Sequence, residues 1–259
     1  MTAPTVAACQ MPVADLDVET NLERIRRRVF DLSPAVDVAA FPEHALTGFV
    51  PDERLHEHAI AREDGTLDHV RALAADVDRA IVVGFVERAD GTYYNATAYV
   101  GPESTAVYRK RHLWGAERAL LSPGTRRVVV ETPVGRAGLL TCYDLNFVEE
   151  SAAFVRRNVD ALFVAGAWPR AHAENWRLLL RARALDGARW VVGAGRTGRR
   201  DVERAPTAEY AGGSCIVSPD GSVATELDRE SDDCVRTLDS ATLAEHRSTV
   251  FPDSDPSNP

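Results

Sequence analysis

"LLTCYD" (139–144) places a cysteine directly after an apolar run. The run has the composition of a buried β-strand, and a helix is predicted after it at about residues 147–157. Cys142 should therefore lie at the carboxyl end of a strand, where open α/β sheets usually carry their reactive groups. The other three cysteines lie within apolar patterns, where a free thiol usually behaves as a small hydrophobic side chain. These positions make Cys142 the candidate nucleophile.

A thiol with a pKa of about 8.5 needs a partner that removes its proton or stabilises the thiolate. Glu43 is the candidate because it follows the apolar run "VDVAAF" (36–41), an unusual place for an unpaired acid. A carboxylate can act as a base when burial makes it sufficiently basic. The chain also contains 7 histidines, so a Cys–His pair remains an alternative.

Lys110 ends a third apolar run, "TAVYRK" (105–110), and it is the only lysine in the chain. Every other basic residue apart from the histidines is arginine. A compact ammonium fits a small pocket and can approach a developing oxyanion, whereas the planar fork of arginine would fill such a pocket. Lys110 is therefore the candidate for stabilising negative charge on a substrate.

The composition excludes several classes of function. The 259-residue chain has a formal net charge of −9, which argues against nucleic acid or an anionic membrane as a partner. No apolar run is long enough to span a membrane, and no signal peptide is visible. The 4 cysteines show neither CxxC pairing nor metal-ligand spacing. We therefore expect reduced thiols, a cytoplasmic location and no bound metal.

Strands and helices alternate, and several strands come in adjacent pairs, which favours mixed sheets over purely parallel ones. Without a linker or a repeat, the pattern predicts a single domain over residues 1–250 and a flexible tail at 251–259. Strands are predicted at 5–11, 36–41, 80–87, 95–101, 105–110, twice within 126–144, at 159–168, at 189–195 and as a hairpin within 212–227. Helices are predicted at 17–32, 65–78, 147–157 and 172–186.

The contexts "FPE" (41–43), "YRKRHLWGAE" (108–117) and "TCYDLNF" (141–147) resemble the carbon–nitrogen hydrolase (nitrilase) superfamily. The resemblance covers nearly the whole chain, with further landmarks such as "QMP" (10–12) and "LLSPG" (120–124). It implies a four-layer αββα sandwich, in which two mixed β-sheets are flanked by helices. It also implies pairing into a homodimer or a larger homo-oligomer.

The resemblance implies a role for each candidate. Glu43 would be the general base, Lys110 the oxyanion stabiliser and Cys142 the nucleophile. The main-chain amide of Tyr143 would complete the oxyanion site, and Glu117 would orient Lys110 or the substrate. The reaction would hydrolyse a small-molecule amide to a carboxylic acid and ammonia through a thioester, without a metal or organic cofactor.

Two positions bear on the substrate. Relatives that act on substrates with a free carboxylate often carry arginine where this chain has Asn146, and relatives acting on amine-bearing substrates often carry an acid. The uncharged amide of Asn146 therefore predicts a neutral or weakly polar substrate, unless another residue supplies charge to the pocket. Trp168 either lines the pocket or belongs to the core.

Other interpretations remain. An N-carbamoyl-amine amidohydrolase or a nitrilase would use the same triad, and a binding module could keep the fold without catalysis. "GAGRTG" (193–198) lacks the following helix of a dinucleotide site, so its glycines are expected to permit a tight loop. "HEH" (56–58) lacks a third metal ligand, and "NAT" (95–97) is a glycosylation motif without meaning in a chain that is not exported.

Overall fold

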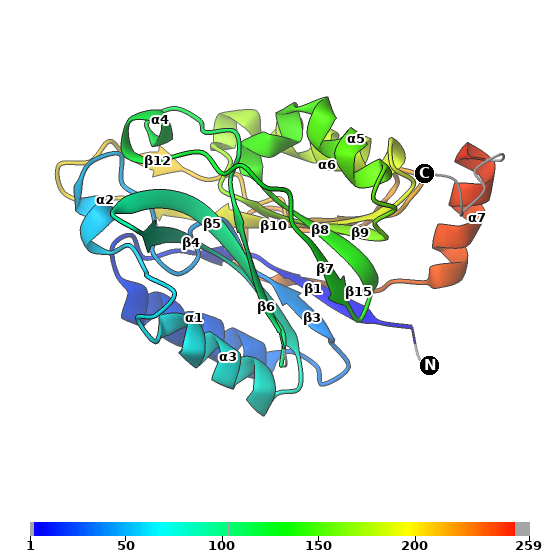
Figure 1. The fold of residues 1–259 in the computed structure, drawn as a ribbon, viewed down its shortest axis with the longest axis horizontal. Helices are drawn as coiled ribbons and strands as arrows, with labels where there is room; N and C mark the ends of the chain where they lie inside the picture. Colours follow the sequence, from blue (N-terminus) through cyan, green and yellow to red (C-terminus); the bar gives the residue numbers. More distant parts are fainter. Residues whose placement is uncertain (1–2, 103, 252–259) are drawn as a thin grey trace.

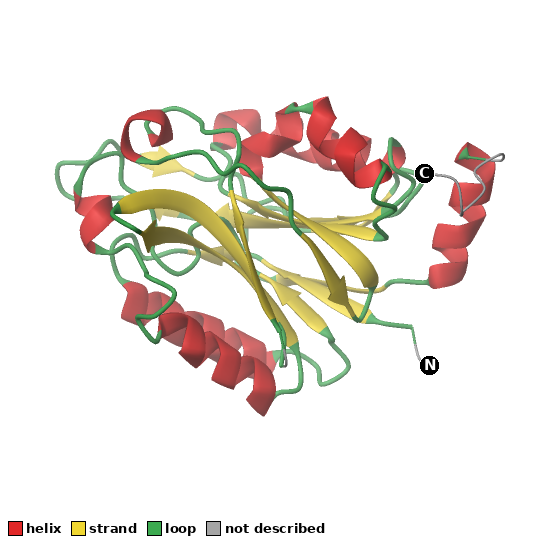
Figure 2. Cartoon of the chain, viewed as in Figure 1, coloured by secondary structure: helices red, strands yellow, loops and turns green. Residues whose placement is uncertain are grey.

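The computed structural model describes residues 3–102 and 104–251. Two β-sheets lie face to face, and helices cover the outer face of each (Figures 1 and 2). This arrangement confirms the predicted αββα sandwich. The predicted flexible tail lies outside the described residues, apart from Phe251.

The first sheet has the strand order β15-β1-β3-β4-β5-β6. The pairs β1–β3 and β3–β4 are parallel, and the remaining pairs are antiparallel, so the sheet is mixed as predicted. Its strands are β1 (Thr5–Cys9), β3 (Val38–Ala40), β4 (Ala80–Ala89), β5 (Thr92–Val100), β6 (Thr105–Arg109) and β15 (Asp233–Thr237).

The second sheet has the order β14-β13-β10-β9-β8-β7, and the short strand β2 pairs with β10 off this path. It is also mixed, because β8, β9 and β10 run parallel between antiparallel neighbours. Its strands are β2 (Met11–Pro12), β7 (Val129–Thr132), β8 (Gly135–Thr141), β9 (Ala161–Gly166), β10 (Trp190–Thr197), β13 (Cys215–Val217) and β14 (Val223–Glu226). A separate ribbon joins β11 (Arg199–Arg200) to β12 (Ala208–Glu209).

Helices α1 and α3 cover the first sheet, and α5 and α6 cover the second (Figure 1). The start of α1 is fixed by Asp17, whose side chain accepts a hydrogen bond from the main-chain N–H of Thr20. No helix in the described part of the chain is long and apolar enough to cross a membrane. The helices are α1 (Val18–Asp31), α2 (Arg54–Glu57), α3 (Thr66–Asp76), α4 (Glu117–Leu120), α5 (Val148–Val155), α6 (Ala173–Leu185) and α7 (Ser240–Val250), with 3₁₀ helices η1 (Cys142–Asn146) and η2 (Arg170–His172).

The central strands are apolar on both faces because each sheet is buried on both sides. Along β1, Val6 and Ala8 face the core between the sheets, whereas Ala7 and Cys9 face α1 and α3. This alternation follows from the two-residue period of a strand. It explains why residues 6–9 are continuously hydrophobic.

The structure differs from the predicted elements at several places, and the short elements α4, β11 and β12 are additions to them. The run at 5–11 is divided at Gln10 into β1 and β2, which belong to different sheets. The glycines at 193 and 195 do not form the expected loop; they lie inside β10, and only Gly198, with φ of 80°, turns the chain. Strand β15 and helix α7 were not predicted at all.

We expect Gly84→Ala to disturb the active site from within the first sheet. A Cβ atom on Gly84 would meet the main-chain N of His44 at 2.6 Å and the Cα of Glu43 at 2.8 Å. Overpacking of this kind costs about 1–3 kcal/mol of folding free energy. Urea unfolding should show that loss, and the rate of substrate turnover should fall because the turn that carries Glu43 must shift.

The matched control is Gly101→Ala, directly after β5 of the same sheet. A Cβ at Gly101 would have its nearest contact at 3.3 Å, with the ring of Tyr99, and no positive φ opposes the change. If both variants lost equal stability and activity, close packing of Gly84 against the Glu43 turn would not be the cause.

Candidate active site

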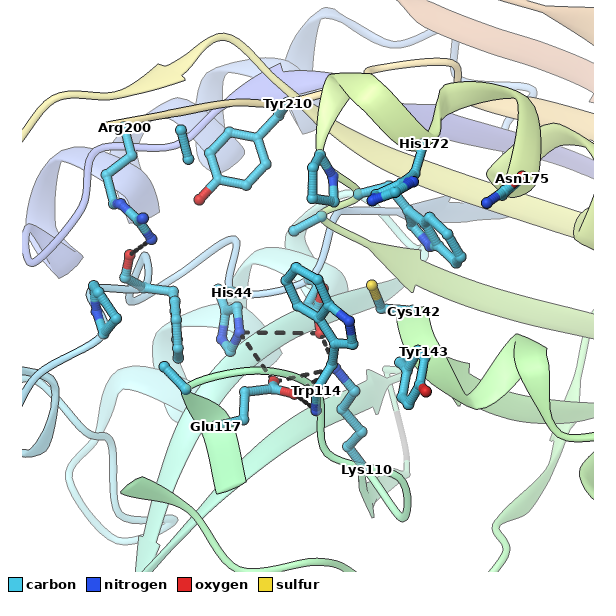
Figure 3. Close-up of a pocket in the computed structure, with 18 of the residues that line it drawn as sticks. His44, Lys110, Trp114, Glu117, Cys142, Tyr143, His172, Asn175, Arg200 and Tyr210 are labelled. Carbon is cyan, nitrogen blue, oxygen red and sulfur yellow. Dashed lines mark hydrogen bonds and ion pairs between the residues drawn. The ribbon is translucent and has the colours of Figure 1, made fainter. Parts of the chain in front are cut away.

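Three polar side chains at strand ends line one cavity of about 370 Å³. Glu43 follows β3, Lys110 follows β6 and Cys142 follows β8. Because β3 and β6 belong to the first sheet and β8 to the second, the packing of the two sheets brings these residues together. Figure 3 shows the Cys142 thiol and the Lys110 ammonium facing this cavity.

Cys142 is the first residue of η1, directly after β8, and its backbone is strained. Its φ is 50°, in the left-handed region that non-glycine residues rarely adopt. Such a conformation costs about 1–3 kcal/mol and persists only where surrounding contacts impose it. Here the contacts are reciprocal, because Thr141 Oγ1 accepts from the N–H of Asp144 and the Asp144 carboxylate accepts from the N–H of Thr141. The turn thereby fixes the direction of the thiol.

The ammonium of Lys110 lies between two buried carboxylates. Nζ donates to Glu43 Oε1 at 2.8 Å and to Glu117 Oε2 at 2.8 Å. The side chain of Lys110 is 2% exposed, that of Glu43 4% and that of Glu117 6%. Solvent therefore screens these ion pairs little. Sequence analysis predicted all three residues for one site, and the structure places them in direct contact.

Glu117 has both oxygens occupied as acceptors. Oε2 accepts from Lys110 and, at 2.8 Å, from the main-chain N–H of Trp114. Oε1 accepts from the side-chain amide of Asn95 at 2.5 Å and from Lys110 at 3.1 Å. A carboxylate bonded in this way orients its neighbours and is poorly placed to receive a further proton.

Glu43 differs from Glu117 in its effect on the Cys142 thiol. Its Oε1 accepts from Lys110 and, at 2.8 Å, from Asn95, and its carboxylate lies near enough to the thiol for its negative charge to raise the pKa of Cys142. Of the two carboxylates, Glu43 is therefore the one placed to take a proton from Cys142.

Asn95 is a site residue that sequence analysis missed. The residue lies on β5, is fully buried, and donates from Nδ2 to both Glu43 and Glu117. Its two amide hydrogens thus hold the carboxylates on either side of Lys110. The local sequence signal is a single amide at the start of an apolar strand, within a glycosylation motif. The burial of Asn95 removes it from modification.

His44 is the second neighbour that sequence analysis did not identify. The ring is buried, stacks on Phe49 with centroids 4.9 Å apart, and places Nε2 3.8 Å from Glu117 Oε1. Together, Glu43, His44 and Glu117 have ligand atoms within 4.8 Å of one another, a spacing that could hold a metal ion. The Lys110 ammonium already bonds to both carboxylates and would repel a second cation there.

The protonation states follow from burial and from the neighbouring charges. Burial alone would lower the pKa of Lys110, but the carboxylates of Glu117 and Glu43 raise it well above its usual value. Burial, reinforced by the charge of Glu43, raises the pKa of the Cys142 thiol well above its usual value. The resting site therefore contains a charged ammonium and a protonated thiol, and the thiol needs a base to react.

The remaining predicted residues also line the cavity. The main-chain N–H of Tyr143 lies in the first turn of η1, where such groups have no partner within the helix. Asn146 lies exposed at the rim, and its Nδ2 donates to the carbonyl of Tyr143 at 3.2 Å. Trp168 fits both predictions, because it lines the cavity and packs against Trp176 with ring centroids 6.2 Å apart.

Arg200 supplies a positive charge that sequence analysis did not anticipate at the cavity. The residue is 8% exposed, and its guanidinium donates to the carbonyls of Pro206 at 2.9 Å and Phe49 at 3.3 Å. Figure 3 shows Arg200 and Tyr210 at the end of the cavity opposite Cys142. In an arginine-rich segment, "RTGRRDVERA" (196–205), no sequence feature distinguishes this arginine from its neighbours.

Comparisons with known proteins agree on one family. The family model "Carbon-nitrogen hydrolase" matches residues 5–248. The chain is 33% identical over 222 residues to an (R)-stereoselective amidase of Pseudomonas sp, covering 85% of this chain and 80% of the relative. It is 27% identical to the 2-oxoglutaramate amidase of Bacillus subtilis, covering 95% of each. A solved CN-hydrolase superfamily protein from Xanthomonas campestris is similar with a TM-score of 0.87 and 26% identity, covering 97% and 96% of the two chains.

We expect iodoacetamide to alkylate Cys142 before any other cysteine. Cys142 lines the cavity, whereas the other three thiols are buried and burial raises their pKa values. Glu43→Gln should slow the alkylation by about tenfold or more, because the thiol loses the base that accepts its proton. Intact-mass and peptide mass spectrometry would follow the labelling.

The matched control is Glu149→Gln, which neutralises an exposed carboxylate near the same turn. It should leave the labelling rate unchanged. Equal labelling of all four cysteines, in the native protein, would contradict a reactive site and favour a non-catalytic module.

Proposed function

The chain belongs to the carbon–nitrogen hydrolase family, as an amidase-type enzyme acting on C–N bonds outside peptides, and we propose that it cleaves a small linear amide to a carboxylic acid and ammonia. The observation that carries this proposal is the contact of Glu43, Lys110 and Cys142 around one cavity. A carboxylate base, an ammonium and a thiol are the groups that thioester-forming hydrolysis requires.

In the first half of the reaction, Glu43 takes the proton of Cys142 as the sulfur attacks the amide carbon. The negative charge moves to the amide oxygen, where Lys110 and the N–H of Tyr143 stabilise it. The protonated Glu43 then gives its proton to the departing nitrogen. Ammonia leaves, and the acyl group remains on sulfur as a thioester.

In the second half, water replaces ammonia in the cavity. Glu43 takes a proton from the water as its oxygen attacks the thioester carbon, and the same two donors stabilise the oxyanion. When the C–S bond breaks, the proton held by Glu43 returns to the sulfur. The carboxylic acid leaves, and Cys142 and Glu43 are back in their starting states.

Hydrogen counting supports the role of Lys110. An ammonium has three hydrogens: two make the 2.8 Å bonds to Glu43 and Glu117, and the third has only the longer contact of 3.1 Å with the second oxygen of Glu117. A substrate oxygen would replace this longer contact, and the electrostatic effect of the ammonium on it is largest in a site from which water is excluded. Glu117 acts by holding the ammonium in place.

The apolar part of the cavity lining favours an uncharged substrate. Its walls include Phe49, Trp114, Trp168 and Pro169, which offer apolar contacts, and Asn146 at the rim carries no charge. Such a lining favours a substrate whose acyl chain is apolar or weakly polar. This is the substrate class that the proposal names.

Arg200 favours a second candidate. The three hydrogen bonds of its guanidinium go to main-chain carbonyls, which do not neutralise its charge. An amide that carries a carboxylate far from the scissile bond could therefore pair with it. Hydrolysis of a carbamoyl amine or a nitrile would use the same catalytic residues, and no contact in the cavity favours either over an amide.

We also propose the type of partner, the cellular location and the assembly of the enzyme. The negative net charge favours a small-molecule substrate over nucleic acid or an anionic membrane surface. Four free thiols support a reducing, cytoplasmic location. Exposed Val148 on α5 and Leu178 and Leu185 on α6 support pairing of two copies through this helix layer.

We expect ammonia release from a linear aliphatic amide, measured against Cys142→Ala as the blank. Lys110→Arg should lower kcat by about 100-fold or more, because the guanidinium displaces the charge that faces the oxyanion. Arg126→Lys, an exchange at an exposed position, is the control and should leave kcat unchanged. Full activity of Cys142→Ala would contradict the proposal, and release of carbon dioxide with ammonia would identify a carbamoyl amine.

Three amides of equal length that end in methyl, carboxylate or ammonium should separate the two substrate candidates. We expect the methyl-ended amide to have the highest kcat/KM, with Arg200→Gln changing its KM by less than about threefold. If the second candidate is right, the carboxylate-ended amide is preferred and Arg200→Gln raises its KM by about tenfold or more, as loss of a charged hydrogen bond does. Arg199→Gln at the exposed neighbouring position is the control.

A further inference from the structure

The Asp144 carboxylate joins the two segments that carry the nucleophile and the ammonium. On the nucleophile side, Oδ2 accepts from the N–H of Thr141 at 3.1 Å, one residue before Cys142. On the other side, the same oxygen accepts from the hydroxyl of Tyr108 at 2.7 Å, and Oδ1 accepts from the N–H of His112 at 3.0 Å.

Tyr108 and His112 lie two residues before and two residues after Lys110. The carboxylate of Asp144 thus holds the Lys110 segment at both sides of the lysine. Since Asp144 is itself two residues after Cys142, its contacts tie the two reactive positions across the boundary between the sheets. Asp144 and Tyr108 are both fully buried, so water does not compete for these bonds.

The three hydrogen bonds to Asp144 require both of its side-chain oxygens to be acceptors. Two main-chain N–H groups and one hydroxyl point at the carboxylate, and the main-chain groups cannot reverse their direction. An asparagine at this position would turn its NH₂ group toward either His112 N–H or Thr141 N–H. One donor would then face another donor and lose its hydrogen bond.

We propose that Asp144 is a positioning residue that sets the distance between Lys110 and Cys142 and so aligns the oxyanion donors with the nucleophile. The proposal rests on the amidase function above. Asp144 does not line the cavity; it acts through the two segments that it joins. A displacement of about 1 Å between such groups can cost about 100-fold in rate.

Protonation of the Asp144 carboxyl should make this positioning role visible in the pH dependence of the reaction rate. Burial raises the pKa of Asp144 to about 6, and the charge of Lys110 and the Tyr108 hydroxyl lower it. As the pH falls through about 6, the carboxyl takes up a proton and can no longer accept at every position. The titratable or charged groups that act on this carboxyl or its partners are Lys110, Tyr108, His112, Glu150 and Arg111.

Tyr108→Phe and Asp144→Asn test the proposal in the full-length enzyme. Both should lower kcat by about tenfold or more and change KM by less than about threefold, because the acyl-binding walls are untouched. The wild-type rate should fall on the acid side near pH 6. Asp144→Asn should lose that step, and Tyr108→Phe should move it to higher pH, since the hydroxyl that lowers the pKa of Asp144 is gone.

Tyr99→Phe is the matched control, because Tyr99 is buried in the same core between the sheets on the adjacent strand. It should keep the wild-type kcat and pH profile. Tyr108→Phe keeps the ring, so it tests the proposal even if Asp144→Asn fails to fold.

Wild-type kcat and pH profile in Tyr108→Phe would overturn the positioning role while leaving the amidase function intact. Equal losses in Tyr108→Phe and Tyr99→Phe would also overturn it, because packing would then be the cause. An absence of ammonia release from every amide by the wild-type enzyme would instead refute the proposed function.

Discussion

The candidate active site depends on one buried ammonium held between two carboxylates. Lys110 has nearly no contact with solvent, and its charge is compensated by Glu43 and Glu117 at hydrogen-bonding distance. Loss of one partner from such a buried group costs about 3–5 kcal/mol, so the three residues form a unit in which each needs the others. The same compensation keeps the ammonium charged and keeps Glu43 beside the Cys142 thiol. The single lysine of the chain thus has a structural and a chemical reason to differ from the arginines.

Sheet packing supplies the precision that this cluster needs. Glu43 and Lys110 come from the ends of strands in the first sheet, and Cys142 comes from the second. No local turn could join them, because they are far apart in the sequence. The core between the sheets therefore fixes their separation, and buried polar contacts from Asn95 and Asp144 refine it. The packing of the two sheets therefore links the fold to the proposed catalytic site.

The main elements could be predicted because buried strands have continuous apolar runs. The three reactive residues could be predicted because each joins two signals, a side chain suited to the chemistry and a position at the end of such a run: Glu43, Lys110 and Cys142. Strand β15 and helix α7 gave weaker signals: β15 is an edge strand with mixed polarity, and of α7 only Leu243 is buried. Asn95, His44 and Arg200 were missed because their roles come from distant contacts. A buried amide or one arginine among many has no local pattern that reports its partner.

The central claim is that Lys110 remains charged inside the protein, and the single lysine makes a direct test feasible. Labelling the chain with ¹⁵N-lysine should give one side-chain NMR signal, whose chemical shift can be followed with pH. We predict an ammonium that stays protonated well above the usual lysine pKa of about 10.4, and that titrates at lower pH in Glu117→Gln. A signal that titrates at or below the usual value in the wild-type protein would contradict it.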